Sequence, residues 1–108
     1  FKPYSVRIKE IAPQLLLERR CDTANVIEAL ATKRGSLENA LVEEGTNFQT
    51  VIVEVRKKIL IDAIRNGLTI KEIYPLLGYP EPSNVYWFSK RFLGMRFNDF
   101  YDMVKNET

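Results

Sequence analysis

The sequence predicts an all-α fold of about seven helices, and three observations support this prediction. Apolar residues recur at intervals of three and four residues along nearly the whole chain, as they do on the buried side of a helix. Gly and Pro residues stand between these apolar stripes, where helices begin and end. The chain has 108 residues, 45% of them apolar, which is enough for one ordinary core and too apolar for a disordered segment.

The first three expected helices occupy the N-terminal 45 residues. The first one carries the apolar positions Val6, Ile8, Ile11, Leu15 and Leu16, but Pro13 lies inside it, so this helix is expected to be kinked or divided. Asp22 is a good N-cap for a helix over residues 23–30, because its carboxylate accepts hydrogen bonds from free backbone N–H groups. A turn at residues 31–33 leads to a third helix over residues 34–44, which Gly45 ends.

The longest expected helix follows Gly45. Thr46 and Gln49 have the spacing of a capping box, in which a Thr and a Gln side chain satisfy each other's backbone donors. One apolar stripe then continues from Phe48 to Ile64 and stops before Gly67.

Three shorter helices are expected in the rest of the chain. Thr69 and Glu72 repeat the capping-box spacing and open a helix that Gly78 ends. Pro82 suits the first position of the next helix, which runs to about residue 93. Asn98 is expected to cap the last helix.

Residues 22–44 and residues 69–93 share one pattern, which is a capped short helix, a tight turn and a longer helix. This is the helix-turn-helix arrangement, whose second helix can enter the major groove of DNA. The helix between them has about 20 residues and spans roughly 30 Å, close to the repeat of about 34 Å between successive turns of DNA. We therefore expect a first helix-turn-helix subdomain at residues 1–45, a connector helix at 46–67 and a second subdomain at 68–108.

The second subdomain carries sequence motifs of a known family. These are Gly67-Leu68-Thr69-Ile70-Lys71-Glu72-Ile73, Leu77-Gly78-Tyr79, Pro82-Ser83 and Lys90-Arg91-Phe92-Leu93-Gly94-Met95. In these motifs, and in residues 44–48 with Val55-Arg56, the chain resembles the C-terminal DNA-binding domain of AraC/XylS-type transcriptional regulators over about residues 5–104. The resemblance implies a homeodomain-like arrangement, binding to double-stranded DNA and regulation of bacterial transcription.

The resemblance also implies what accompanies such a domain. It implies a sensor or dimerisation domain before Phe1, and a chain that begins with Phe rather than Met fits a fragment. RNA polymerase is a further expected partner, and a cytoplasmic, nucleoid-associated location is expected. No cofactor is expected, and the short apolar runs predict no membrane span.

The first recognition helix offers four candidate DNA contacts, Lys33, Arg34, Ser36 and Asn39. Lys33 and Arg34 can bind phosphate, and Asn39, which stands where the family usually has an Arg, can still read adenine. Glu38 opposes them, because it would repel the DNA backbone unless it accepts from cytosine. Two interpretations stay open: a reading helix, or a solvated helix that no longer reads bases.

The second recognition helix offers six candidates, Ser83, Asn84, Tyr86, Trp87, Lys90 and Arg91. Lys90 and Arg91 form a phosphate-binding pair in this interpretation, with a solvated charge pair as the alternative. Trp87 stands where the family usually has a base-reading Arg, and it can press against a thymine methyl group or pack in the core. Three neighbouring aromatic residues, 86–88, cannot all be buried on one helical stripe, so at least one is expected to be exposed.

Enzymatic function has no support in the sequence. The chain has no His and one Cys, which excludes His-based catalysis, ordinary zinc sites and an internal disulfide. Cys21 is expected to be a partly buried filler, and the basic run Arg56-Lys57-Lys58 is expected to face solvent. The net charge of +2 neither requires nor forbids nucleic acid. The alternative to DNA binding is therefore a degenerate helix-turn-helix domain that binds other proteins.

Overall fold

The computed structural model describes residues 2–107, and over this range it contains seven α-helices, one π-helical turn and no β-strand. The predicted all-α fold is therefore confirmed. The α-helices are α1 (Tyr4–Leu17), α2 (Thr23–Ala29), α3 (Arg34–Glu43), α4 (Phe48–Arg65), α5 (Ile70–Leu76), α6 (Pro82–Phe88) and α7 (Phe97–Asn106). The π-helical turn (Ser89–Leu93) continues α6 without a break.

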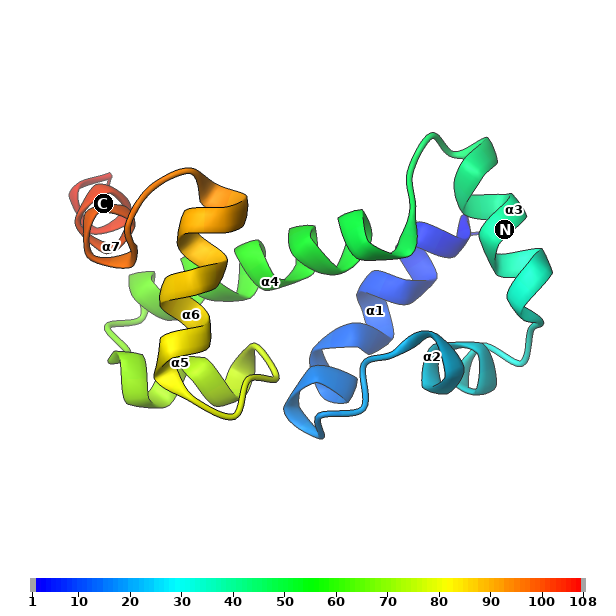
Figure 1. Cartoon of the computed structure of the whole chain (residues 1–108), viewed down its shortest axis with the longest axis horizontal. Coiled ribbons are helices and arrows are strands. Elements are labelled where there is room, and N and C mark those ends of the chain that lie inside the picture. The colour runs from blue at the N-terminus through cyan, green and yellow to red at the C-terminus, as the bar shows by residue number, and fades with distance from the viewer. Residues whose placement is uncertain (1, 108) are drawn as a thin grey trace.

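Helix α4 runs through the middle of the molecule and joins two groups of helices (Figure 1). Helices α1–α3 gather around its N-terminal half, and α5–α7 around its C-terminal half. Helix α1 packs along α4 and also contacts α5, so it touches both groups. The molecule is elongated, with extents of 40, 26 and 23 Å.

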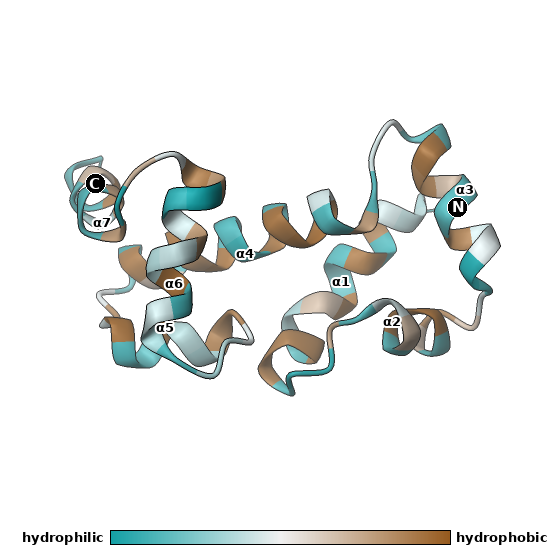
Figure 2. Ribbon diagram, in the orientation of Figure 1, coloured by the Kyte–Doolittle hydropathy of each residue, from teal (hydrophilic) through white to brown (hydrophobic). Residues whose placement is uncertain are grey.

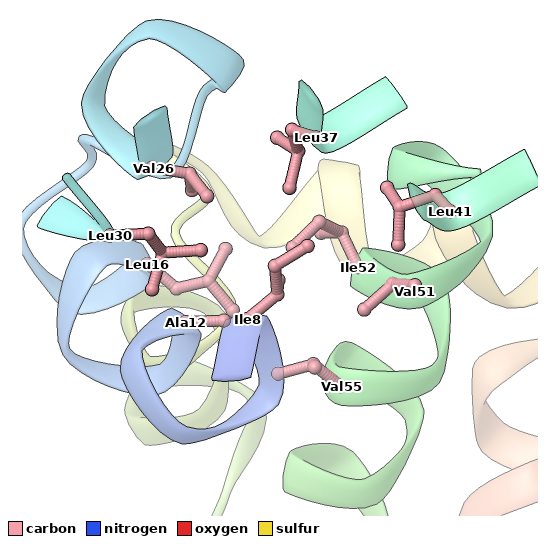
Figure 3. Close-up of a cluster of buried hydrophobic side chains, with 10 residues drawn as sticks. All are labelled: Ile8, Ala12, Leu16, Val26, Leu30, Leu37, Leu41, Val51, Ile52 and Val55. Atoms are coloured by element: carbon pink, nitrogen blue, oxygen red, sulfur yellow. The ribbon is translucent and has the colours of Figure 1, made fainter. Parts of the chain in front are cut away.

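Each group has its own hydrophobic core, and α4 contributes to both. Its N-terminal half supplies Val51, Ile52 and Val55 to the first core, where they meet side chains from α1, α2 and α3 (Figure 3). Its C-terminal half supplies Leu60, Ala63 and Ile64 to the second core, which also holds buried side chains of α5, α6 and α7. The apolar bands that recur along α4 in Figure 2 mark the side of the helix that faces the two cores.

Helix α1 is a single helix that includes Pro13, so it is not divided at this residue. Pro13 cannot donate to the carbonyl of Lys9, one turn before it. Both residues are exposed, so water can satisfy that carbonyl. The proline is tolerated because it lies on the outer side of α1, while Ile8, Ala12 and Leu16 fill the core.

Two of the four predicted N-caps are confirmed. The carboxylate of Asp22 accepts from the backbone N–H of Asn25 at 2.8 Å. The capping box of Thr69 and Glu72 is present, and a Glu72 carboxylate oxygen accepts from the Thr69 backbone N–H at 3.1 Å.

The other two predicted caps are wrong by one or two residues. Asn47, not Thr46, caps α4, and its side chain accepts from the Thr50 N–H at 2.9 Å. Thr46 instead belongs to the end of α3, where its N–H donates to the Leu41 carbonyl at 2.9 Å across the left-handed Gly45. Arg96 is the residue before α7, and Asn98 lies inside that helix, which already begins at the buried Phe97.

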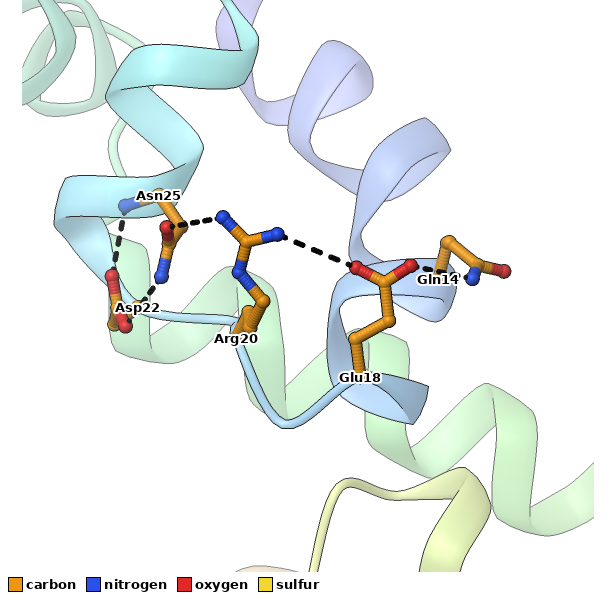
Figure 4. A network of polar contacts seen from close by, with 5 residues as sticks. All are labelled: Gln14, Glu18, Arg20, Asp22 and Asn25. Atoms are coloured by element: carbon orange, nitrogen blue, oxygen red, sulfur yellow. Dashed lines mark hydrogen bonds and ion pairs between the residues drawn. The ribbon is translucent and has the colours of Figure 1, made fainter.

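Asp22 also anchors a small polar network at the start of α2 (Figure 4). Its second carboxylate oxygen accepts from the Asn25 side chain at 2.8 Å, and Arg20 donates to Asn25 at 3.1 Å. We expect Asp22→Ala to lower the free energy of unfolding by about 1 kcal/mol, because the cap of α2 is lost. Urea denaturation measures this change.

Asp22→Asn is the matched control, because an Asn side chain can still accept from the Asn25 N–H. It is expected to stay within about 0.5 kcal/mol of the original chain. Equal stability of the Ala and Asn variants would contradict a capping role for Asp22.

Candidate nucleic-acid interface

The turns between α2 and α3 and between α5 and α6 have the same backbone geometry. In the first turn, the Thr32 N–H donates to the Ile27 carbonyl at 3.1 Å, and in the second, the Tyr79 N–H donates to the Tyr74 carbonyl at 3.2 Å. The residue before each donor is left-handed, Ala31 with φ of +53° and Gly78 with φ of +79°. This pattern is the usual way in which a helix ends before a reversal. The two helix-turn-helix segments therefore agree in structure although one has Ala where the other has Gly.

Helix α3 and the residue before it, Lys33, present the four predicted DNA-contact residues to solvent. Leu37 is 1% exposed and faces the core, which leaves the other side of the helix free. The exposed candidates are Lys33, Arg34, Ser36 and Asn39. Glu38 is exposed as well, and its carboxylate lies 3.9 Å from the Arg34 guanidinium. Glu38 thus competes for the positive charge that a phosphate would need, although so exposed a pair is weak.

Helix α6 presents three of its four predicted contact residues in the same way. Ser83, Tyr86 and Trp87 are exposed, whereas Phe88 is completely buried. The expectation that the three neighbouring aromatic residues cannot all be buried is confirmed. Asn84 is half-buried, and its side-chain oxygen is enclosed without a hydrogen-bond partner.

The two exposed aromatic rings of α6 are each held by an edge contact. Tyr86 lies edge-on to Phe97 with ring centroids 5.4 Å apart, and Trp87 lies edge-on to Phe92 at 5.7 Å. Trp87 nevertheless keeps 55% of its surface exposed. Such rings are oriented before any ligand arrives, so little side-chain entropy is lost when they make contact.

The π-helical turn after α6 places Lys90 and Arg91 on the exposed surface. The turn itself is anchored by Ser89, which is fully buried and donates to the Val85 carbonyl at 2.9 Å. Helical spacing predicted that residues 82–93 form one helix, and the extra residue of the π-turn was not visible in that spacing.

Arg96 is a basic residue of this surface that sequence reasoning missed. It lines a hollow together with Tyr86, Lys90, Phe97 and Asn98. Its position, two residues after the left-handed Gly94 and directly before α7, was the available signal, because such a turn brings the start of the next helix back beside the previous one. Lys90 and Arg96 therefore flank one depression next to Tyr86.

The prediction that Arg56 faces solvent is wrong, because its side chain is half-buried. Lys57 and Lys58 are exposed, as predicted. Its Nε donates to the Leu77 carbonyl at 2.9 Å, and its guanidinium carbon lies 4.4 Å from the centroid of the Tyr79 ring. Position 56 borders the apolar stripe of α4, next to Val55, so the side chain reaches along the protein rather than into water. Burial raises the pKa of the Tyr79 hydroxyl, and the charge of Arg56 partly opposes this effect.

Cys21 is half-buried, as predicted. Burial raises the pKa of its thiol, Arg56 opposes that shift, and Asp22 adds to it. The thiol is therefore protonated at neutral pH and is a poor nucleophile.

Within residues 2–107, no group of three or more His, Cys, Asp or Glu side chains is placed to hold a metal ion. Over the same residues, no helix combines the length and the apolar character that a membrane crossing needs.

Part of the chain is similar to two curated proteins. These are uncharacterised HTH-type transcriptional regulators, one from Mycobacterium bovis and one from Mycobacterium tuberculosis. Each is 38% identical over 61 residues, which is 56% of this chain and 18% of the relative. The chain thus spans less than a fifth of the length of these relatives. No family model matches the chain, and no solved structure matches it significantly.

Proposed function

We propose that this chain is the sequence-specific DNA-binding domain of a bacterial transcriptional regulator of the AraC/XylS type. In this proposal α3 and α6 enter adjacent major grooves on one side of the DNA. The observation that carries the proposal is the pair of helix-turn-helix units, each exposing the outer side of its second helix, at the two ends of the 18-residue helix α4. Such a helix spans about 27 Å, which suits elements that must reach successive grooves about 34 Å apart. The likeness to HTH-type transcriptional regulators supports the same function.

The exposed residues divide into two roles under this proposal. Phosphate contacts are assigned to the basic side chains Lys33, Arg34, Lys90 and Arg91, with Arg96 beside them. Base contacts are assigned to the polar and aromatic side chains Ser36, Asn39, Ser83, Asn84, Tyr86 and Trp87. Asn84 would have to turn outward to take part, because its side-chain oxygen is enclosed and has no hydrogen-bond partner.

The proposal extends to the protein of which this domain is a part. Residues 1–45 and 68–108 act as the two DNA-binding subdomains, and residues 46–67 as the connector. A sensor or dimerisation domain precedes them, RNA polymerase is a partner, and the protein works in the cytoplasm on the nucleoid. The function is binding, and no catalytic step belongs to it.

A degenerate domain that binds another protein is the second candidate function. Two features of α3 favour it. Glu38 pairs with Arg34, and Val42 leaves 72% of its surface exposed on the same helix. Titration with mixed-sequence duplex DNA at low salt separates the two candidates, because non-specific binding needs only phosphate contacts. Absence of binding under these conditions would overturn the DNA-binding proposal.

Lys90→Ala is expected to weaken binding to all duplex sequences alike. A lost phosphate contact lowers the slope of log affinity against log salt concentration by about 1. Fluorescence anisotropy over a range of salt concentrations, on one selected site and one random duplex, measures both effects.

Two variants serve as references for this measurement. Lys58→Ala removes the same charge from α4, away from α6, and is expected to leave the slope nearly unchanged. Trp87→Ala is expected to change which sequences are preferred while keeping the slope. A Lys90→Ala protein with the original affinity and slope would refute the assignment of Lys90 to phosphate.

A further inference from the structure

The first unit (α1–α3) and the second unit (α5–α7) approach each other where the end of α1 and the turn between α5 and α6 lie beside the middle of α4. From α4, Arg56 donates to the Leu77 carbonyl at 2.9 Å and lies over the Tyr79 ring at 4.4 Å. Leu77 and Tyr79 are the residues on either side of Gly78, at the turn of the second unit. Arg56 therefore holds the turn that leads directly into α6.

The same turn rests on the first unit from the other side. A Cβ atom at Gly78 would lie 2.8 Å from the Leu16 carbonyl oxygen and 3.3 Å from the Leu16 Cα. The backbone of this turn is thus in direct contact with the last residues of α1, whose side chains fill the first core. Contacts on two sides, one polar and one steric, leave the turn little freedom to slide or rotate relative to the first unit.

We infer that Arg56 is a positioning residue that sets the spacing and angle between the two recognition helices. The inference rests on the proposed function, since it concerns how one chain matches two half-sites. When the two units are rigidly linked, binding of one unit to its half-site makes binding of the second unit intramolecular, which raises affinity without new contacts to DNA. This gain requires that the spacing and angle of the two units match those of the two half-sites. Arg56 in this role touches no DNA and acts through the Leu77 carbonyl and the Tyr79 ring.

The chemistry of the contact requires Arg rather than any cation. A guanidinium is planar, so it can lie over an aromatic ring while its Nε donates in the same plane. A Lys ammonium has one nitrogen and no planar face, so it cannot lie over the ring with one atom and donate to the carbonyl with another. Arg56→Lys thus keeps the charge of α4 but loses the combined contact with the Leu77 carbonyl and the Tyr79 ring. This variant separates a positioning role of Arg56 from an attraction of its charge to phosphate.

The test uses Arg56→Met and Arg56→Lys, with Lys57→Met as the matched control. Lys57 is the exposed neighbour of Arg56 on α4, and its replacement removes the same charge. Sites selected from a random duplex pool supply the two half-sites, and insertion of two base pairs between them turns one half-site by about 70° relative to the other. We expect both Arg56 variants to bind the uninterrupted site about tenfold more weakly and to lose most of the penalty for the insertion. Their affinity for a single half-site is expected to stay within about twofold, since the reading side chains are unchanged.

A second readout needs no DNA. Spin labels at Glu43→Cys in α3 and Ser83→Cys in α6, with Cys21→Ala, report the distribution of distances between the two units. We expect this distribution to broaden in Arg56→Met and Arg56→Lys and to stay narrow in Lys57→Met. If the wild-type chain binds no duplex at low salt, the proposed function fails. The spin-label distances still show whether Arg56 fixes the position of one unit relative to the other.

Three outcomes would overturn the inference. The first is a distance distribution in the Arg56 variants as narrow as in the original chain. The second is an unchanged penalty for the two-base-pair insertion. The third is wild-type behaviour of Arg56→Lys beside a defective Arg56→Met, which would mean that charge alone matters. Should Arg56→Met fail to fold, Arg56→Lys together with Tyr79→Leu keeps the test complete, because Tyr79→Leu removes the ring from under the guanidinium.

Discussion

Phe88→Ala is expected to lower the free energy of unfolding by about 3–5 kcal/mol, which is a large part of the stability of a small domain. The Phe88 side chain is completely buried in the second core. Its ring lies 5.4 Å from that of Phe92 and 6.3 Å from that of Tyr79. Truncation removes apolar burial and leaves a cavity between α6, the π-helical turn and the turn that Arg56 holds.

Urea denaturation followed by far-UV circular dichroism measures this effect, and the fluorescence of Trp87, the single Trp of the chain, reports on α6 itself. Trp87→Ala is the control, since it removes a larger ring from the next position of the same helix. Trp87 keeps 55% of its surface exposed and lies edge-on to Phe92, so we expect a change of about 1 kcal/mol. If the two variants lost similar stability, the inward direction of residue 88 and the outward direction of residue 87 would be wrong.

Gly78→Ala is expected to destabilise the chain by about 3 kcal/mol, because two penalties coincide at this residue. Its φ of +79° is strained for any residue with a Cβ atom. The added Cβ would also lie 2.8 Å from the Leu16 carbonyl oxygen, which is backbone and cannot rotate away. Relief requires the second unit to move away from α1, and this also loosens the bond between Arg56 and Leu77.

Gly94→Ala separates the two penalties. Gly94 has a similar φ of +72°, but an added Cβ there meets nothing within 4 Å. We expect only the conformational penalty of about 1 kcal/mol for this variant. Thermal and urea denaturation of both proteins give the comparison. A Gly78→Ala protein no less stable than Gly94→Ala would show that the turn is not held against Leu16.

Local patterns of the sequence predicted the seven helices, the cap at Asp22 and the capping box at Thr69, because each depends on residues within one or two turns of one another. The errors arose where two local signals compete. Thr46 and Asn47 are both good N-caps, and the choice depends on whether the residue after Gly45 is needed to end α3. The π-helical turn at residues 89–93 was not expected, because one extra residue in a helical turn leaves no mark in the spacing of the apolar residues.

The candidate DNA surface could be predicted only in part. Apolar residues at helical spacing identify the buried side of a helix, so the opposite side is expected to be exposed. Leu37 of α3 and Phe88 of α6 face the core as expected. On each helix, the residues on the side opposite this buried residue therefore face outward. Arg96 was missed because its position beside Lys90 depends on how α7 returns after Gly94. The role of Arg56 was missed because its partners are 21 and 23 residues away in sequence, on another unit.

By itself, the sequence determined that this protein is helical, the order and approximate extent of its helices, and that one helix-turn-helix pattern occurs twice. These properties follow from backbone capping and from the period of the apolar residues, which act over a few residues. Only the tertiary structure decided how the two units sit relative to each other. That arrangement depends on the contact of Gly78 with Leu16 and on the bond from Arg56 to Leu77, which join segments whose approach no local pattern records.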